Sequence, residues 1–207
     1  IMYVLVESGI ITKHFNNPKG FTLGNLQYPA DLFMKWSVAE KEAIGIYEVV
    51  FDDSNKKDEK WYINTNQSFA FADGVVTASY GTATAKAHAD TTWSQDDEDA
   101  GDLPDDKSVG DVKVEGLKTT LIRTLKSQVA NELARTDWYI TRNTEKSTAI
   151  PSAISTHRDA VRTKQASIEA QITGASDTAA LETLHTYTTD SDGVQSRPLG
   201  TLPTLEL

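Results

Sequence analysis

The chain has 207 residues and a formal net charge of −10, from 30 acidic and 20 basic side chains. This charge argues against a general nucleic-acid binder, because neutralising phosphates requires clustered Lys and Arg. The chain has no cysteine, which excludes disulfides, thiol nucleophiles and thiolate metal sites. No apolar run approaches the ~20 residues of a membrane helix, and the N-terminus lacks the pattern of an export signal.

The first ninety residues read as strands around one short helix. Residues 2–7 alternate in the manner of a buried strand, and Ser8-Gly9 turns this strand into a second one over residues 10–15. Asp73-Gly74 lies between two further apolar runs and predicts a two-residue type I′ hairpin. Other strands are expected over residues 45–51, 61–63 and 68–71. We therefore predict a small antiparallel sheet.

The single helix of this part is predicted from its ends. Ser37 is followed three residues later by Glu40, the pattern of a capping box in which each residue bonds the backbone amide of the other. Gly45 ends the helix, because glycine adopts the left-handed conformation that often follows a last helical turn.

Composition changes between residues 90 and 113. This segment carries nine carboxylates against two lysines, a net charge of −7, and has few apolar side chains. Such a segment gains little from folding, so it predicts a flexible linker. A calcium loop is the lesser alternative. Counted from Asp97, position 6 is Asp102 instead of glycine and position 12 is Ser108 instead of glutamate, so the EF-hand pattern fails.

After residue 114 the apolar period becomes helical. One apolar stripe recurs every four residues (Leu117, Leu121, Leu125, Val129, Leu133), and a second follows at helical spacing (Ile154, His157, Val161, Gln165, Ile168, Ile172). Thr136 is expected to cap a short helix between them, Pro151 to occupy the first position of the second long helix, and Ser176 to cap a last helix. Two long helices with facing stripes predict an α-helical hairpin.

No residue pattern points to catalysis. The four histidines lack the spacing of a helical zinc pair, and His157 lies on an apolar stripe where a core or interface histidine is expected. His157, Arg158 and Asp159 are not a triad, because adjacent helical residues point in different directions. Phosphate-binding glycine loops and nucleophile elbows are absent. We therefore predict no enzyme, no cofactor and no metal site.

The segment between the two long helices is the most distinctive. Trp138 and Tyr139 suit either a ligand platform or, as the preferred interpretation, an anchor between helices. Arg142, Arg158 and Arg162 suit either an anion site or, again preferred, ion pairs with nearby carboxylates such as Glu145 and Asp159.

Two parts of the chain resemble proteins of tailed bacteriophages. The first runs from Gly20-Phe21-Thr22-Leu23 to Ile46-Tyr47 and resembles an N-terminal module common in such phages. The second contains Thr136-Asp137-Trp138, Arg142, Glu145, Ile150-Pro151, Arg158 and Arg162, and resembles the helical end of tail fibre assembly and related tail-associated proteins. This resemblance supplies no catalytic residues. It implies a virion location, after assembly in the cytoplasm of the bacterial host.

These observations define one organisation. We predict an α+β protein with a β-rich docking domain over residues 1–89, an acidic flexible linker over 90–113, a helical domain over 114–188 and a coil tail over 189–207. Packing between helices, within the chain or between copies, is assigned to six residues: Leu117, Leu121, Leu125, Trp138, Val161 and Ile168.

The resemblance supports two functional hypotheses. The first is a structural virion component of a tailed phage, in the tail or its fibres, that acts through protein–protein contact. Its expected partners are other phage structural proteins and copies of itself in a homo-oligomer, with no nucleic acid and no membrane. The alternative is a tail fibre assembly chaperone that binds fibre proteins transiently.

Overall fold

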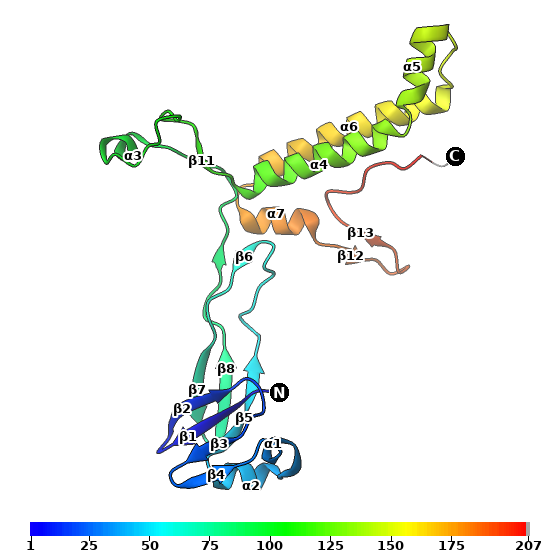
Figure 1. Cartoon of the computed structure of the whole chain (residues 1–207). Coiled ribbons are helices and arrows are strands. Elements are labelled where there is room, and N and C mark those ends of the chain that lie inside the picture. Colours follow the sequence, from blue (N-terminus) through cyan, green and yellow to red (C-terminus); the bar gives the residue numbers. More distant parts are fainter. Residues whose placement is uncertain (206–207) are drawn as a thin grey trace. The chain divides into compact units, whose positions relative to one another are not determined.

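The computed structural model describes residues 1–205. The chain divides into two compact units, the first covering residues 1–84 and the second beginning at residue 85. A sheet rich in antiparallel pairs makes up most of the first unit and long helices dominate the second, so the predicted α+β class is confirmed (Figure 1). The boundary lies before the one predicted between residues 89 and 90.

A five-stranded sheet forms the centre of the first unit. Its order is β2 (Ile10–Phe15), β1 (Tyr3–Glu7), β5 (Ile46–Asp52), β8 (Val75–Ser79) and β7 (Ser68–Ala72). Neighbours are antiparallel except β5 and β8, a parallel pair that the sequence did not reveal. Both predicted hairpin turns are confirmed, because Ser8-Gly9 and Asp73-Gly74 have positive φ at both positions, as type I′ turns require.

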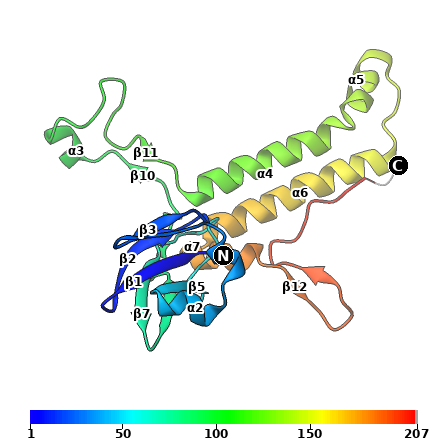
Figure 2. The ribbon, with the colours of Figure 1, turned by 60° about the horizontal axis from the view of Figure 1, so that its bottom comes forward.

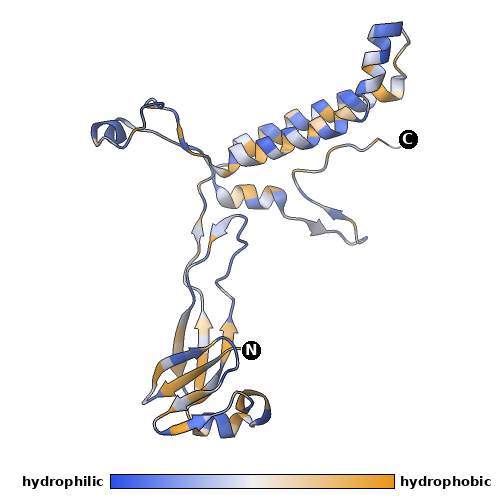
Figure 3. Cartoon of the chain, in the orientation of Figure 1, coloured by the Kyte–Doolittle hydropathy of each residue, from blue (hydrophilic) through white to orange (hydrophobic). Residues whose placement is uncertain are grey.

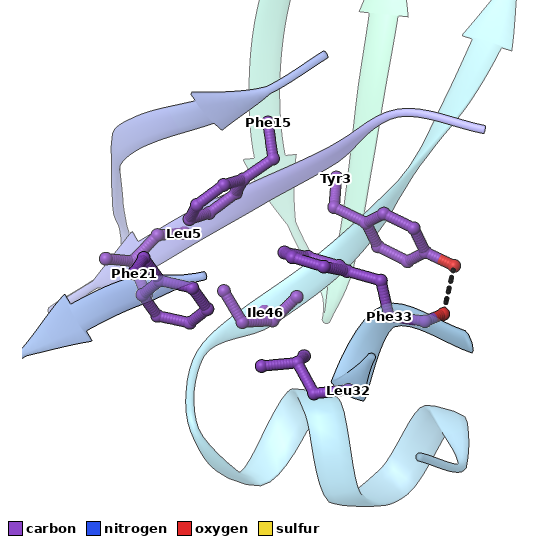
Figure 4. Close-up of a cluster of buried hydrophobic side chains, with 7 residues drawn as sticks. All are labelled: Tyr3, Leu5, Phe15, Phe21, Leu32, Phe33 and Ile46. Carbon is purple, nitrogen blue, oxygen red and sulfur yellow. Dashed lines mark hydrogen bonds between the residues drawn. The ribbon is translucent and has the colours of Figure 1, made fainter. Parts of the chain in front are cut away.

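Strand β1 is buried on both faces of this sheet. Tyr3 and Leu5 belong to an aromatic cluster on one side, whereas Val4 and Val6 belong to a cluster of valines and one alanine on the other. The aromatic cluster appears in Figure 4, and it consists of Tyr3, Leu5, Phe15, Phe21, Leu32, Phe33 and Ile46. Alternation of side chains along a strand places these two sets on opposite faces.

Short elements complete the aromatic side of the sheet. They are β3 (Phe21–Leu23), β4 (Leu26–Tyr28), α1 (Leu32–Lys35) and α2 (Val38–Ala43). The capping box of α2 is confirmed, since Ser37 accepts from the Glu40 amide at 3.3 Å and Glu40 accepts from the Ser37 amide at 2.8 Å. The prediction of one helix was incomplete, because the four-residue helix α1 precedes α2 and supplies Leu32 and Phe33 to the cluster.

Gly45 is required where α2 passes into β5. Its φ is +80°, and a Cβ at this position would lie 2.5 Å from the carbonyl oxygen of Val6. Val6 in turn donates its N–H to the carbonyl oxygen of Gly45 at 2.8 Å.

The remaining short strands are β6 (Tyr62–Ile63) and β9 (Thr84–Ala85).

The acidic segment differs from the predicted linker. Residues 90–113 carry β10 (Thr91–Thr92) and α3 (Gln95–Asp99), and β11 (Val112–Val114) returns antiparallel to β10. Ser94 and Asp97 form a capping box at the start of α3, and Lys113 pairs with Asp97 at 2.6 Å. This segment, which we call the acidic excursion (residues 91–115), belongs to the second unit. Helix α3 is hydrophilic throughout (Figure 3). Composition alone did not predict these elements, because capping and hydrogen bonding stabilise them in place of an apolar core.

The base of the acidic excursion is closed by Asp90. Its carboxylate accepts from the backbone N–H of Gly116 at 2.7 Å and from the Thr119 hydroxyl at 2.8 Å. These hydrogen bonds lower the pKa of Asp90. A Cβ on Gly116 would lie 2.3 Å from the carbonyl carbon of Ala89, so only glycine fits at this crossing.

Four helices follow: α4 (Leu117–Ala134), α5 (Asp137–Lys146), α6 (Ser152–Gly174) and α7 (Thr178–His185). Helices α4 and α6 lie side by side as the predicted hairpin (Figure 2), with Leu125, Val129, Val161 and Ile168 buried. None of the helices described over residues 1–205 is both long enough and apolar enough to span a bilayer.

Three predicted helix caps differ in detail. Thr136 precedes α5 but makes no capping bond with its side chain. Pro151 is the cap of α6 and not its first residue. Asp177, instead of Ser176, caps α7 by accepting from the Ala180 amide at 2.8 Å.

The predicted coil tail also contains structure. It includes a small antiparallel pair, β12 (Thr188–Thr189) and β13 (Gln195–Ser196), and Leu199 is buried at 3% exposure. Residues 206 and 207 of that predicted tail lie outside the described part of the chain.

Candidate interaction site

The turn from α4 to α5 is organised around the side chain of Arg158 on α6. Its Nη1 lies 2.8 Å from the carbonyl oxygen of Leu133, 2.7 Å from the hydroxyl of Thr136 and 2.8 Å from a carboxylate oxygen of Asp137. Arg158 is only 8% exposed, and Thr136 is buried at 1%. A buried guanidinium is tolerated when its N–H groups are paired. Here the pairing fixes the direction in which α5 leaves α4.

The hydroxyl of Thr136 is used twice in this turn. It donates to the carbonyl of Leu133 at 3.0 Å and accepts from Arg158. This explains why Thr136 does not cap α5, since its side chain is committed to α4 and α6. Thr136, Asp137 and Arg158 of the sequence motif therefore serve first to join helices α4, α5 and α6.

A second polar cluster lies one residue away on α6. Glu132 is 3.0 Å from Nε2 of His157 and is held by Arg135 at 3.1 Å. Burial raises the pKa of Glu132, but hydrogen bonds from Arg135, His157 and the backbone N–H of Leu205 together hold it below its ordinary value. Glu132 therefore carries a negative charge near neutral pH and joins α4, α6 and the segment near residue 205.

Helix α5 presents an aromatic surface to solvent. Trp138 is 51% exposed and Ile140 is 38% exposed. The rings of Trp138 and Tyr139 lie 3.8 Å apart between centroids, and the Arg142 guanidinium lies 4.6 Å from the Trp138 ring and 5.4 Å from the Tyr139 ring. Among the described residues, Nε of Arg142 is the one buried side-chain nitrogen or oxygen without a hydrogen-bond partner. We call Trp138, Tyr139, Ile140 and Arg142 the α5 tip.

Comparison with protein-family models, with curated proteins and with solved structures gives no match for this chain.

Five of the six predicted packing residues are buried or half-buried, and Trp138 is the exception. Leu125, Val161 and Ile168 are buried in the second unit, and Leu117 and Leu121 are half-buried on α4. Trp138 was predicted to pack between helices. It is instead half exposed and contacts Tyr139 and Arg142 of its own helix. Sequence spacing could not reveal this, because the rotation of α5 is set by Arg158.

The predicted ion pairs of the three arginines are only partly correct. Arg162 lies 3.6 Å from Asp159, as expected. Arg158 pairs with Asp137 instead of its sequence neighbour Asp159, and Arg142 stacks on two rings. The importance of Glu132 and Thr136 as partners was missed, since these residues are 25 and 22 positions from the α6 residues that they bind.

Two open pockets are lined by few side chains that could act in catalysis. The larger, about 620 Å³, lies where α6 meets α7 and is lined mainly by small or neutral side chains, among them Ala175, Ala180 and Leu184. The smaller, about 450 Å³, is in the first unit and includes His14, Asn16 and Phe69. Over residues 1–205 no group of three His, Asp or Glu side chains is placed to hold a metal ion.

Proposed function

We propose that this chain is a structural component of a tailed phage, in the tail or its fibres, and that it acts by protein–protein contact through the α5 tip. The observation that carries this proposal is the exposure of Trp138 beside Tyr139 and Arg142. Trp, Tyr and Arg are the residue types that most often dominate binding energy at protein interfaces.

The construction of the tip supports this proposal. Arg158 fixes the start of α5 through three hydrogen bonds, so the aromatic surface is held in one orientation before any partner arrives. Such preorganisation reduces the entropy lost on binding. The residues at this corner are also those that resemble tail-associated phage proteins, namely Thr136, Asp137, Trp138, Arg142 and Arg158.

The partners in this proposal are other tail or fibre proteins, together with further copies of the chain. Mass spectrometry of purified particles tests the first part, and we expect this chain among the virion proteins. Its absence from complete particles would contradict a structural role.

A matched pair of substitutions tests the surface itself. Trp138→Ala should reduce incorporation into particles, whereas Phe51→Ala, which removes an aromatic side chain of nearly equal exposure (48%) in the first unit, should not. Circular dichroism of both variants checks that folding is retained. Equal incorporation of the two variants would exclude the α5 tip as the contact surface.

The assembly chaperone is the second outcome of these experiments. Exposed apolar side chains at the tip, Trp138 and Ile140, suit a reversible contact as well as a permanent one. A chaperone would raise the yield of correctly assembled fibre protein on co-expression and would then be missing from the mature particle. The two roles are separated by these two measurements together.

A further inference from the structure

The segment after β13 is packed against the helical unit. We call residues 197–205 the strap. The backbone N–H of Leu199 donates to the carbonyl of Leu184 on α7 at 3.1 Å, and the Leu199 side chain is 3% exposed. Arg197 Nε donates to the carbonyl of Gly200 at 3.0 Å and lies over the Tyr187 ring. The strap therefore starts from a fixed point on α7.

From this point the strap runs beside α6 in both views of the ribbon (Figures 1 and 2). Gly200 faces Lys164, since a Cβ at residue 200 would lie 2.5 Å from Nζ of Lys164. Farther along, the backbone N–H of Leu205 donates to Glu132 on α4, the residue that also contacts His157. The strap thus passes from α7 over α6 to α4.

The burial of Val161 agrees with this path. His157, Val161 and Lys164 are four and three residues apart, so they share one face of α6. Val161 has 0% exposure, although two helices alone leave the sides of their contact open to water. The strap passes the residues on either side of Val161, because Gly200 lies at Lys164 and Leu205 lies at Glu132, the partner of His157.

The leucines of the strap follow a regular spacing. Leu199, Leu202 and Leu205 recur every third residue, with Pro198 and Pro203 between or beside them. An extended chain of the polyproline II type repeats every three residues, so such a chain presents these leucines along one side. Leu199 is buried and the other two are half-buried. The strap therefore covers the helical unit as an extended leucine-bearing segment, from Leu184 on α7 past Lys164 on α6 to Glu132 on α4. We call this covered part of the helices the strap surface.

The connection between α7 and the strap is exposed throughout. Every residue from Thr186 to Ser196 is exposed, including both strands β12 and β13. Fully extended, this connection spans up to roughly 35 Å. An exposed connection of this reach between a helix and a docked segment is the arrangement that permits exchange of the segment between identical copies.

We propose that the strap surface is a self-association site, in which the strap of one copy replaces the strap of another. The occupant is a second copy of this chain, because each copy supplies both the strap surface and the segment that covers it. All contacts between strap and strap surface are the same in the closed and the exchanged forms, so the balance depends on concentration and on the connection. This inference specifies the surface of the proposed self-association, and its test requires no phage particle.

The absence of cysteine makes a direct test possible. Two single-cysteine chains, Lys164→Cys and Thr201→Cys, are mixed at high concentration, warmed to release the strap, cooled and treated with a short bismaleimide. Only strap exchange brings the two cysteines together in different chains. The same two substitutions in one chain report docking within that chain. Ser127→Cys, an exposed position on α4, replaces Lys164→Cys in the matched control.

We expect an interchain product well above that of the control pair, rising with protein concentration. It should also rise with salt, which screens the repulsion between copies of charge −10. Changing Leu199, Leu202 and Leu205 to Ser in the Thr201→Cys chain should abolish the product, while circular dichroism reports whether the helices persist. If the doubly substituted chain cross-links internally and the mixture gives no more product than the control, exchange does not occur. Failure of the internal cross-link would show that the strap is not docked and would also overturn the proposal.

Discussion

Different interactions stabilise the interior of each of the two units. The first unit has a cluster of large rings on one face of its sheet, with Phe33 5.1 Å from Tyr3 and 5.2 Å from Phe15 between ring centroids. The second unit has a thin line of aliphatic side chains between α4 and α6, and its corners are fixed by polar groups, above all Arg158. Apolar burial is strong but has little directional preference, whereas hydrogen bonds specify where a helix points.

This difference suggests a division of roles. A sheet with an aromatic core is a stable base, because each buried ring removes a large apolar area from water. A hairpin with a polar corner sets the orientation of a surface, in this case the α5 tip. The following substitutions test whether the contrast is real.

The largest effect is expected from Phe15→Ala. Phe15 is 2% exposed and contacts both Phe21 and Phe33, so its removal leaves a cavity among rings. The free energy of unfolding of the first unit should fall by about 3–5 kcal/mol. Denaturant titration followed by amide NMR signals of each unit measures this loss. Phe51→Ala is the control and should change the value by about 0.5 kcal/mol or less, because Phe51 is half exposed.

Arg158→Ala should have the next largest effect, this time in the second unit. The change removes the hydrogen bond from Arg158 to the carbonyl of Leu133, which keeps its bonds from Thr136. It also leaves the buried hydroxyl of Thr136 without the donor from which it accepts. We expect a loss of about 2–3 kcal/mol in the free energy of unfolding. Arg162→Ala is the control, since Arg162 is exposed and 3.6 Å from its partner. Equal losses for both arginines would mean that the corner does not depend on Arg158.

Trp138→Ala should change stability little. Trp138 is 51% exposed and its main contacts are Tyr139 and Arg142, so the loss should be about 1 kcal/mol or less. Thermal unfolding measures this value. A large loss would instead support the packing role that sequence spacing predicted for this residue, and would weaken its assignment to an interaction surface.

The smallest effect should be local and dependent on pH. Hydrogen bonds from Lys113 and from Ser94 lower the pKa of Asp97 from 3.8 to about 2. Because the folded pKa lies below the unfolded value, the contribution of Asp97 is complete above pH ~4 and is lost as the pH falls toward 2. The acidic excursion should open in this range before the hairpin does. The NMR signal of the Trp93 indole, which lies under Lys113, reports the opening. In Asp97→Asn this pH-dependent step should disappear.

Local sequence signals determined the elements that depend on near neighbours. Ser8-Gly9, Asp73-Gly74 and the capping box of Ser37 and Glu40 specify their own backbone geometry, because the interacting groups lie within three residues of one another. The apolar periods of α4 and α6 predicted the hairpin for the same reason, since a helical stripe is a local property.

Only the tertiary structure decided the rest. The parallel pairing of β5 with β8, the closure of the acidic excursion by Asp90 and Gly116, and the strap along α6 all join residues far apart in sequence. The exposure of Trp138 belongs to this group. Its residue type and spacing suited a buried anchor, but the direction of α5 depends on Arg158, 20 or more residues away, through bonds that no local pattern records. A helix specifies which residues share a face, and its packing partners decide which face is buried.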